Sequence, residues 1–263
     1  MIGRLLPEAA ACWEVFGERP AFPVYRAEEA AVRGRAPGRR REFAGGRYCA
    51  HRALERLGVP AGAVPAGERG APRWPRGVVG SITHCRGYTA AAVARSGGIA
   101  ALGIDAEPQL PLPPDVLEHI AGPGERARVR ALLAERPGVC WDRLLFSAKE
   151  SVYKAWFPAE GRFLGFRQAR VSLGPAAGAF RVRIEEPGAH GRGRGALPAE
   201  LAGRWACGRG VLVTAVAVPA GAGPVVPGPA GAVPTGAVPA VAVPAGAVAG
   251  SGGPPAAEEE EWG

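Results

Sequence analysis

The sequence predicts an α+β protein of two similar lobes, each a long helix packed on a small, mostly antiparallel sheet, followed by a disordered C-terminal tail. Two observations support this fold class. Along a chain of 263 residues, a helical pattern followed by strand-like runs occurs twice, which is typical of α+β architectures. The C-terminal end shows neither pattern. We therefore expect lobes at residues 1–106 and 107–218 and a tail at 219–263.

In the first lobe, apolar residues at helical spacing predict a helix over about residues 39–57. Pro37 precedes this segment and Gly58 follows it, as is typical of helix boundaries. Short runs rich in Val, Ile, Thr and Ala then predict strands, and the Arg-Ser-Gly-Gly sequence at 95–98 is typical of a hairpin turn between two of them. The predicted strands are 77–83, 88–94 and 99–105.

The second lobe repeats this order. Apolar residues again recur at helical spacing over about residues 142–157, and Pro158 is expected to stop the helix. Strand-like runs follow, interrupted by a loop rich in Gly and Arg at 188–195. The predicted strands are 169–173, 179–186, 204–207 and 211–218.

The tail is apolar and repetitive, but its composition does not fit a membrane span. It contains nine prolines and ten glycines, whereas a spanning helix must satisfy all of its backbone hydrogen bonds internally. We therefore expect residues 219–263 to be disordered, and we expect no association with a membrane.

Charge is distributed unevenly along the chain. The formal net charge is +8, and because the tail holds four glutamates and no basic residue, the preceding 218 residues carry +12. Such a basic body fits an anionic partner, that is, a nucleic acid, a phosphorylated small molecule or an acidic protein. The five cysteines form no C-x-x-C pair and no signal-peptide pattern opens the sequence. These features predict a cytoplasmic protein without a disulfide scaffold or a structural zinc site.

Three carboxylates and one lysine form the first candidate site. Asp105 and Glu107 lie two residues apart at the end of a predicted strand and would face the same side. Two interpretations are open: a solvated strand end, or a site that binds a cation. Glu150 and Lys154 would share a helix face, where the plain alternative is a surface ion pair. Because Asp105, Glu107 and Glu150 offer only oxygen ligands, the set favours Mg²⁺ or Mn²⁺ over zinc.

Lysine is rare enough in this chain to be informative. Of the 32 basic residues, only Lys149 and Lys154 are lysines, and both lie beside Glu150 in an otherwise apolar helix. A compact ammonium can approach one phosphate oxygen and transfer a proton, which a guanidinium does poorly. We therefore predict that Lys154 contacts a leaving phosphate and that Lys149 orients or screens the acidic cluster.

Two further groups are candidate phosphate ligands. Thr83 and His84 end a predicted strand, which we expect in the same sheet as Asp105, although a lone histidine is more often structural. Arg39 and Arg47 belong to an arginine-rich helix start, where a solvated helix face is the alternative to phosphate capture. Each signal is weak alone, but together with the acidic residues they indicate a phosphorylated substrate.

Three segments, GSITHC, GIDAE and WDRLLFSAKESVYKAWF in this order, resemble the 4′-phosphopantetheinyl transferases. The branch is that of the enterobactin-synthase component and its actinobacterial relatives, and the likeness runs from about Arg39 to Val218. It implies a monomeric pseudo-dimer of two α+β lobes with CoA and Mg²⁺ between them. It also implies transfer of the phosphopantetheine arm of CoA to a serine of an apo acyl or peptidyl carrier protein, with adenosine 3′,5′-bisphosphate as the other product.

The resemblance also implies roles for the candidate residues. Asp105, Glu107 and Glu150 would hold Mg²⁺ against the CoA pyrophosphate, and Glu150 would activate the carrier serine, directly or through a water. Lys154 would bind the pyrophosphate and assist the leaving group. The CoA phosphates would be contacted by Thr83 and His84, and the 3′-phosphate and adenine side by Arg39 and Arg47.

One position departs from the family pattern. Relatives commonly carry Lys or Arg just before the glycine that corresponds to Gly67, where it helps to hold CoA, and this chain has Ala66 there. Arg69, two residues beyond Gly67, could substitute for that cation. We therefore include Gly67 and Arg69 in the expected CoA-binding set.

The resemblance implies an acidic carrier protein as the partner, steered by the basic body, and neither a nucleic acid nor a membrane. Two alternatives stay open: a basic nucleic-acid-binding module and a catalytically inactive CoA-binding protein. The first predicts aromatic residues interleaved with the basic ones or a known binding motif, and the sequence shows neither. The second would not need a metal, so the presence of all three carboxylates and of Lys154 argues against it. Which carrier is served, in fatty-acid, polyketide, siderophore or other peptide synthesis, stays open.

Overall fold

Helices pack on two antiparallel sheets, one of three strands and one of five, which confirms the predicted mixture of helices and antiparallel strands. The loop expected at 188–195 and nearly all of the expected tail lie outside the described residues. The computed structural model describes residues 1–17, 22–60, 62–174, 178–185 and 197–221.

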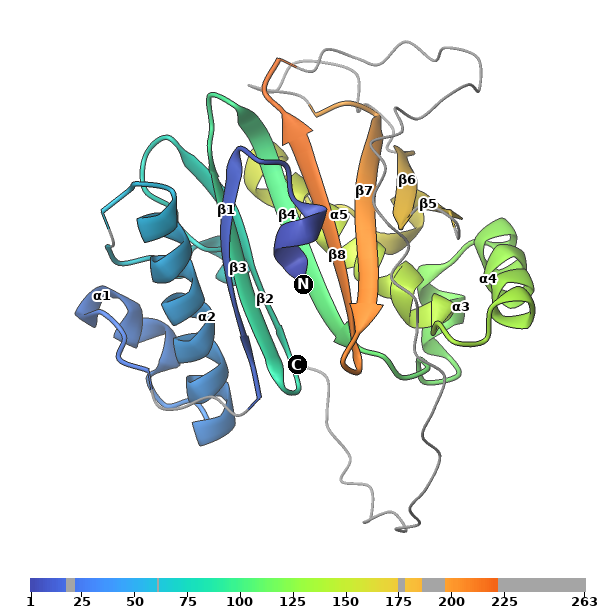
Figure 1. Ribbon diagram of the computed structural model, residues 1–263, viewed down its shortest axis with the longest axis horizontal. Helices are drawn as coiled ribbons and strands as arrows, with labels where there is room; N and C mark the ends of the chain where they lie inside the picture. Colours follow the sequence, from blue (N-terminus) through green and yellow to red (C-terminus); the bar gives the residue numbers. More distant parts are fainter. Residues whose placement is uncertain (18–21, 61, 175–177, 186–196, 222–263) are drawn as a thin grey trace. The chain divides into compact units, whose positions relative to one another are not determined.

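The three-stranded sheet contains two predicted strands and one that is not predicted. β2 (Val78–Cys85) and β3 (Tyr88–Arg95) follow the sequence pattern, whereas β1 (Ala10–Phe16) has no clear alternation. Their order is β1-β3-β2 with antiparallel neighbours. Helix α2 (Pro37–Arg56) lies along this sheet (Figure 1) and starts with a proline in its first turn.

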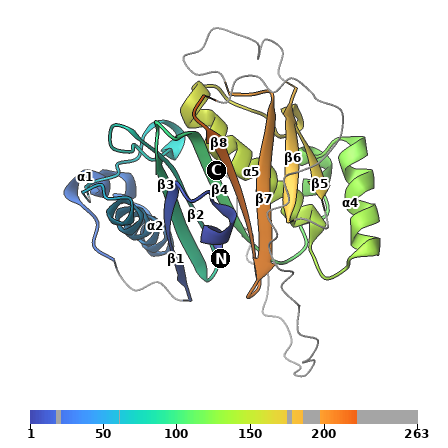
Figure 2. The ribbon, with the colours of Figure 1, turned by 45° about the horizontal axis from the view of Figure 1, so that its top comes forward.

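The five-stranded sheet forms the larger layer. Its strands are β4 (Ile99–Pro108), β5 (Ala169–Gly174), β6 (Ala179–Ile184), β7 (Glu200–Gly208) and β8 (Val211–Pro219). Their order is β4-β8-β7-β6-β5, and every pair is antiparallel. Helix α5 (Trp141–Glu160) crosses the β4 and β8 side of this sheet (Figures 1 and 2).

Shorter helices complete the described chain. α4 (Pro123–Glu135) is not predicted, because prolines and glycines dominate the preceding segment. Its start is nevertheless regular, with a proline in the first turn and Glu125 accepting a hydrogen bond from the Gly122 amide at 2.9 Å. The others are α1 (Arg26–Glu29), α3 (Val116–Ile120) and the 3₁₀ segments η1 (Ile2–Leu5), η2 (Ala30–Val32), η3 (Glu68–Gly70) and η4 (Phe166–Gln168).

The turn at 95–98 does not close the expected hairpin. β3 is hydrogen-bonded on both edges, to β1 and to β2, so no edge is left for β4. β4 pairs with β8 in the other sheet instead. The expectation that Asp105 lies in the same sheet as Thr83 and His84 is therefore wrong.

Side-chain hydroxyls join the two sheets where β2 and β4 run side by side. Ser81 Oγ accepts a hydrogen bond from the Ile104 amide at 3.1 Å and donates to the Ile104 carbonyl at 3.4 Å. Thr83 Oγ1 accepts one from the Ala106 amide at 2.9 Å. Ser81 and Thr83 share one face of β2, and we call these two residues the hydroxyl seam. It replaces a backbone ladder and holds the end of β2 against the end of β4.

Helix α5 approaches β4 most closely at Gly103. A Cβ atom at this position would collide with the Ser151 carbonyl oxygen and would lie 2.6 Å from the Ala155 amide nitrogen, so glycine is required. The hydroxyls of Ser147 on α5 and Thr214 on β8 are 2.9 Å apart and hold the helix further. This packing brings the middle of α5 to the end of β4.

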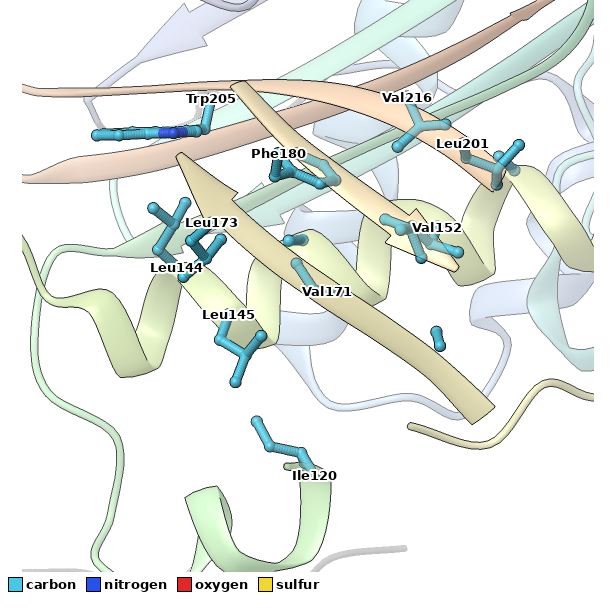
Figure 3. Packing of buried hydrophobic residues seen from close by; sticks show 14 of the residues in the cluster. Ile120, Leu144, Leu145, Val152, Val171, Leu173, Phe180, Leu201, Trp205 and Val216 are labelled. Atoms are coloured by element: carbon cyan, nitrogen blue, oxygen red, sulfur yellow. The ribbon is translucent and has the colours of Figure 1, made fainter. Parts of the chain in front are cut away.

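The same packing buries most of α5 in the main hydrophobic core. Figure 3 shows Leu144, Leu145 and Val152 of α5 beside strand residues that include Phe180 and Val216. All five are almost completely buried. A helix packed in this way has little freedom to rotate or slide. The polar side chains of α5, among them Glu150 and Lys154, are therefore held in place.

The end of α5 differs from the expected one. The helix continues past Pro158 to Glu160, so the prediction that this proline stops it is wrong. Gly161 follows in the left-handed conformation, with φ of 67°, and its amide bonds the Phe157 carbonyl. A glycine in this conformation is a common helix terminator, and it sets the boundary here.

Candidate active site

A cavity of about 380 Å³ is lined by α2, the segment before β2, β2 itself and α5. It brings together five predicted site residues, namely Arg47, Arg69, His84, Glu150 and Lys154. The other lining residues are Ala31, Glu42, Phe43, Gly46, Ala66, Gly70, Ala71, Pro72, Gly80, Ser81, Ile82, Tyr153, Phe157 and Pro158.

Asp105 lies beside this cavity, in contact with Lys154. The carboxylate oxygen Oδ1 accepts hydrogen bonds from Lys154 Nζ at 2.6 Å and from Thr83 Oγ1 at 3.3 Å. The other oxygen, Oδ2, is buried and has no hydrogen-bond partner among the described residues. Since a buried carboxylate oxygen without a donor is unfavourable, Asp105 is arranged to take a further cation or donor.

Glu107 is held by Arg143, which is not among the predicted site residues. Arg143 Nη1 donates to Glu107 Oε2 at 3.0 Å, while Nε and Nη2 donate to the carbonyls of Leu110 and Pro111 at 3.0 and 2.9 Å. Burial and the charge of Asp105 raise the pKa of Glu107 to about 7, although Arg143 acts in the opposite direction. The charged form of Glu107 is therefore disfavoured where it lies, and a further positive partner would stabilise it.

Glu150 and Lys154 form a base and a cation on the cavity wall. Burial raises the pKa of Glu150, with Asp105 acting in the same direction and Lys154 against it. Burial alone would lower the pKa of Lys154, but Asp105 and then Glu150 outweigh it, so that this pKa is raised. Lys154 is therefore charged at neutral pH, and Glu150 is a better proton acceptor than an exposed glutamate.

A hard divalent cation fits beside Asp105 and Glu107. The buried Asp105 Oδ2 needs a positive partner, and both side chains offer only oxygen, the ligand type of Mg²⁺ and Mn²⁺. Within the part of the chain that the structure describes, no three His, Cys, Asp or Glu side chains already form a metal-binding group. Glu150 would therefore have to move to become a third ligand.

Arg47 is a buried cation at the α2 side of the cavity. Its residue exposure is 4 %, its guanidinium carbon lies 4.2 Å from the centre of the Phe43 ring, and its Nε has no hydrogen-bond partner among the described residues. Burial lowers the pKa of Arg47 to about 10, with the charge of Glu28 acting against the shift. A charged guanidinium in this position favours an anionic ligand.

Arg69 lies on the same stretch of wall as Ala66, the residue that departs from the family pattern. Its φ of 50° is left-handed, a conformation that costs a residue with a side chain free energy and that occurs often at functional sites. Its guanidinium carbon is 5.7 Å from the centre of the Phe163 ring. A cation is thus present on this wall at Arg69, three residues after Ala66.

Three other predicted site residues do not line the cavity. Arg39 is exposed at the start of α2 and pairs with Glu42 at 3.3 Å. Gly67 is packed against Arg73, since an added Cβ there would be 3.0 Å from the Arg73 side chain. Thr83 is only 2 % exposed, and its hydroxyl belongs to the hydroxyl seam.

The Lys149 ammonium does not contact the carboxylates of Asp105, Glu107 or Glu150. Its Nζ donates to Glu125 at 3.0 Å and to the carbonyls of Phe166 and Ala169 at 2.7 and 2.8 Å, and the residue is 2 % exposed. This lysine joins α5 to α4 and to the start of β5. The expectation that it orients or screens the acidic cluster is therefore replaced by a structural role.

A signal for Arg143 is present in the sequence. Arg143, Ser147, Glu150 and Lys154 are separated by four, three and four residues, which places them on one face of a helix. This polar stripe faces β4 and β8, because its members contact Glu107, Thr214 and Asp105. The helical spacing of these four polar residues is therefore the sequence signal for Arg143.

Comparison with known proteins assigns the chain to a family. Residues 27–94 match the 4′-phosphopantetheinyl transferase N-terminal domain, and residues 101–196 match the 4′-phosphopantetheinyl transferase superfamily. Over 219 residues, the chain is 50 % identical to the 4′-phosphopantetheinyl transferase Svp of Streptomyces mobaraensis, an alignment that covers 82 % of this chain and 88 % of that protein.

Two further relatives are similar over the same share of the chain. The 4′-phosphopantetheinyl transferase Npt of Nocardia iowensis is 41 % identical, with 82 % of this chain and 99 % of that protein covered. The 4′-phosphopantetheinyl transferase PptT of Mycobacterium tuberculosis is 38 % identical, with 82 % and 97 % covered. With the cavity, the acidic residues and the charged lysine in place, the chain belongs to the 4′-phosphopantetheinyl transferase superfamily.

Proposed function

We propose that this transferase moves the 4′-phosphopantetheine arm of CoA onto a serine hydroxyl of an apo acyl or peptidyl carrier protein and releases adenosine 3′,5′-bisphosphate. One observation carries the proposal. A single cavity of about 380 Å³ is lined by buried Arg47, by Glu150 and by Lys154, which contacts Asp105. A ligand with phosphates at two places, as in CoA, would meet a cation at each.

The arginines account for binding of the nucleotide part of CoA. Arg47 is buried and its Nε has no hydrogen-bond partner in the described part of the chain, so it would hold the 3′-phosphate and adenine side. Arg69 would supply the cation that is missing at Ala66, and His84 would contact a phosphate from the end of β2. Arg39, which pairs with Glu42 of the cavity wall, would reach the ligand from the first turn of α2.

Glu150 and Lys154 account for the proton transfers. Glu150, whose pKa burial raises as long as no cation is bound to it, would accept the proton of the carrier serine directly, or through one water when it is a metal ligand. The serine oxygen would then attack the β-phosphorus of CoA, and the bond from this phosphorus to the bridging oxygen would break. Lys154 would stabilise the charge that develops on the leaving phosphate.

Asp105 and Glu107 would hold Mg²⁺ or Mn²⁺ at the pyrophosphate, with Glu150 as a third ligand after a side-chain movement. A bound divalent cation would neutralise charge on the phosphates during transfer. Thr83 would act through Asp105, because its hydroxyl donates to Asp105 Oδ1 at 3.3 Å. Arg143 would orient Glu107 through the bond to Oε2.

The test of the proposed function is a mass measurement. Purified protein with CoA, Mg²⁺ and an apo carrier should give a carrier heavier by one phosphopantetheine arm. Asp105→Ala and Glu150→Ala should lower the rate by about two orders of magnitude or more, since each removes a charged group from the reacting centre. Glu135→Gln, an exposed change on α4, is the control. No mass gain with several carriers, or an equal gain after both substitutions, would exclude the proposal.

We extend the proposal to the organisation and setting of the protein. Residues 1–106 and 107–218 would be two lobes of a monomeric pseudo-dimer, and the packing of one long helix on each sheet supports two lobes. Strand β4, which spans the boundary, pairs with β8 and so belongs to the sheet of the second lobe. The partner would be an acidic carrier rather than a nucleic acid. Cys12, Cys140 and Cys207 are free thiols, which supports a cytoplasmic setting. No helix among the described residues is long and apolar enough to cross a membrane.

A further inference from the structure

We infer that Arg143 and Lys154 determine which divalent cation the proposed site accepts, by leaving one free oxygen on each of its two carboxylates. Lys154 Nζ lies 2.6 Å from Asp105 Oδ1, and Arg143 Nη1 lies 3.0 Å from Glu107 Oε2. We call these two basic residues the clamp. The inference rests on the proposed function, because it takes Asp105 and Glu107 as the metal ligands.

The oxygens that the clamp leaves are open to an ion. Asp105 Oδ2 is buried without a hydrogen-bond partner among the described residues. Glu107 Oε1 likewise receives no hydrogen bond within the described part of the chain. Asp105 and Glu107 are two residues apart on β4, so their side chains leave the strand on the same side. One oxygen of each carboxylate is therefore available to a shared ion, and the other is taken.

Arg143 is itself fixed, so it is not easily displaced by an ion. Its Nε and Nη2 donate to the carbonyls of Leu110 and Pro111 at 3.0 and 2.9 Å. The neighbouring Asp142 accepts a hydrogen bond from the Leu112 amide at 2.8 Å. The first turn of α5 thus holds the segment after β4 at three points, and the guanidinium edge toward Glu107 Oε2 keeps its place.

One-oxygen binding favours small ions over large ones. Mg²⁺ binds six ligands in a strict octahedron and commonly takes single carboxylate oxygens with water and phosphate, whereas Ca²⁺ takes six to eight ligands and often both oxygens of a carboxylate. With Oδ1 of Asp105 and Oε2 of Glu107 occupied by the clamp, chelation through both oxygens is blocked. The clamp therefore disfavours Ca²⁺ relative to Mg²⁺.

The test compares the affinities of Mg²⁺ and Ca²⁺ for the full chain by calorimetry. Arg143→Met removes every donor but keeps an apolar stem, and it should shift the ratio of the two dissociation constants toward Ca²⁺ by about tenfold. The ratio is the informative quantity. Both ions carry the same charge, so the loss of a nearby positive charge strengthens both and leaves their ratio unchanged. Arg128→Gln, an exposed change on α4, is the control, with an unchanged ratio.

A second variant keeps the inference testable if Arg143→Met does not fold. Lys154→Met removes the closer of the two donors to Asp105 Oδ1, leaving only the Thr83 hydroxyl at 3.3 Å, and should shift the ratio in the same direction. If the unaltered chain binds Mg²⁺ but neither variant shifts the ratio, the clamp is refuted and the proposed function is untouched. If the unaltered chain binds neither ion, with or without CoA, the metal assignment fails and the clamp fails with it.

Discussion

Lys149 and Arg143 show how the geometry of the acceptors decides between the two basic side chains. Lys149 presents one nitrogen to three acceptors, namely a carboxylate and two carbonyls. Arg143 also meets a carboxylate and two carbonyls, but through three separate nitrogens. An ammonium suits the first arrangement and a guanidinium the second. The rarity of lysine in the sequence pointed to position 149 but could not show which acceptors surround it.

This arrangement predicts the effect of a conservative change. Lys149→Arg should lower the free energy of unfolding by about 3 kcal/mol, because a guanidinium cannot bring one nitrogen to three buried acceptors and would leave some of them unsatisfied. Urea denaturation measures the loss. Arg128→Lys on the exposed face of α4 should change stability by no more than about 0.5 kcal/mol. Equal stability of Lys149→Arg and the unaltered chain would contradict the structural role of this lysine.

Among the elements, those with a local signal are the ones that the sequence predicts. α2, α5 and strands β2, β3, β4 and β8 follow from helical spacing or from apolar runs, and each lies within a few residues of its expected place. β1 was missed because its run of small and aromatic residues does not alternate. The pairing of β4 with β8 was missed because it joins segments far apart in the chain, and an adjacent turn sequence favoured the hairpin instead.

The contact of α5 with β4 predicts a specific lesion. Gly103→Ala would place a methyl group against the Ser151 carbonyl and within 2.6 Å of the Ala155 amide. Backbone atoms cannot yield as side chains do, so we expect a loss of about 3 kcal/mol or more. Gly97→Ala, where nothing lies within 4 Å of the added Cβ, is the control. Thermal unfolding compares the two, and a Gly103→Ala variant as stable as Gly97→Ala would show that the helix can move away at little cost.

For the molecule as a whole, motif and spacing mark candidate residues that the fold brings together, whereas they predict the architecture only in part. Motif and spacing single out Asp105, Glu150 and Lys154, and the fold places Asp105 beside Lys154. Arg39 is predicted at the ligand because it is basic and close in sequence to Arg47; it is exposed in the first turn of α2 and pairs with Glu42, which lines the cavity. Helical spacing places a residue on a face, but how deeply it is buried there requires the packing of the whole fold.

The uneven charge of the whole chain predicts a dependence on salt. The first 218 residues carry +12, so an acidic carrier should be attracted over long range. Raising the ionic strength from about 0.05 to 0.5 M should lower kcat/KM for the carrier several-fold and leave kcat little changed, because salt screens the approach and not the reaction. Initial rates at saturating CoA and Mg²⁺ measure both constants. A kcat/KM that does not respond to salt would exclude steering by this charge.

The hydroxyl seam has a mechanical consequence. Each sheet resists shear through several backbone hydrogen bonds per strand pair, whereas Ser81 and Thr83 supply the hydrogen bonds between β2 and β4. The plane of least resistance to sliding therefore passes through the site, between the residues of β2 and those of β4 and α5. A ligand that contacts both sides of this plane stiffens the molecule where it is softest. We therefore expect that binding of a ligand in the cavity slows hydrogen exchange at the amides of Ile104 and Ala106.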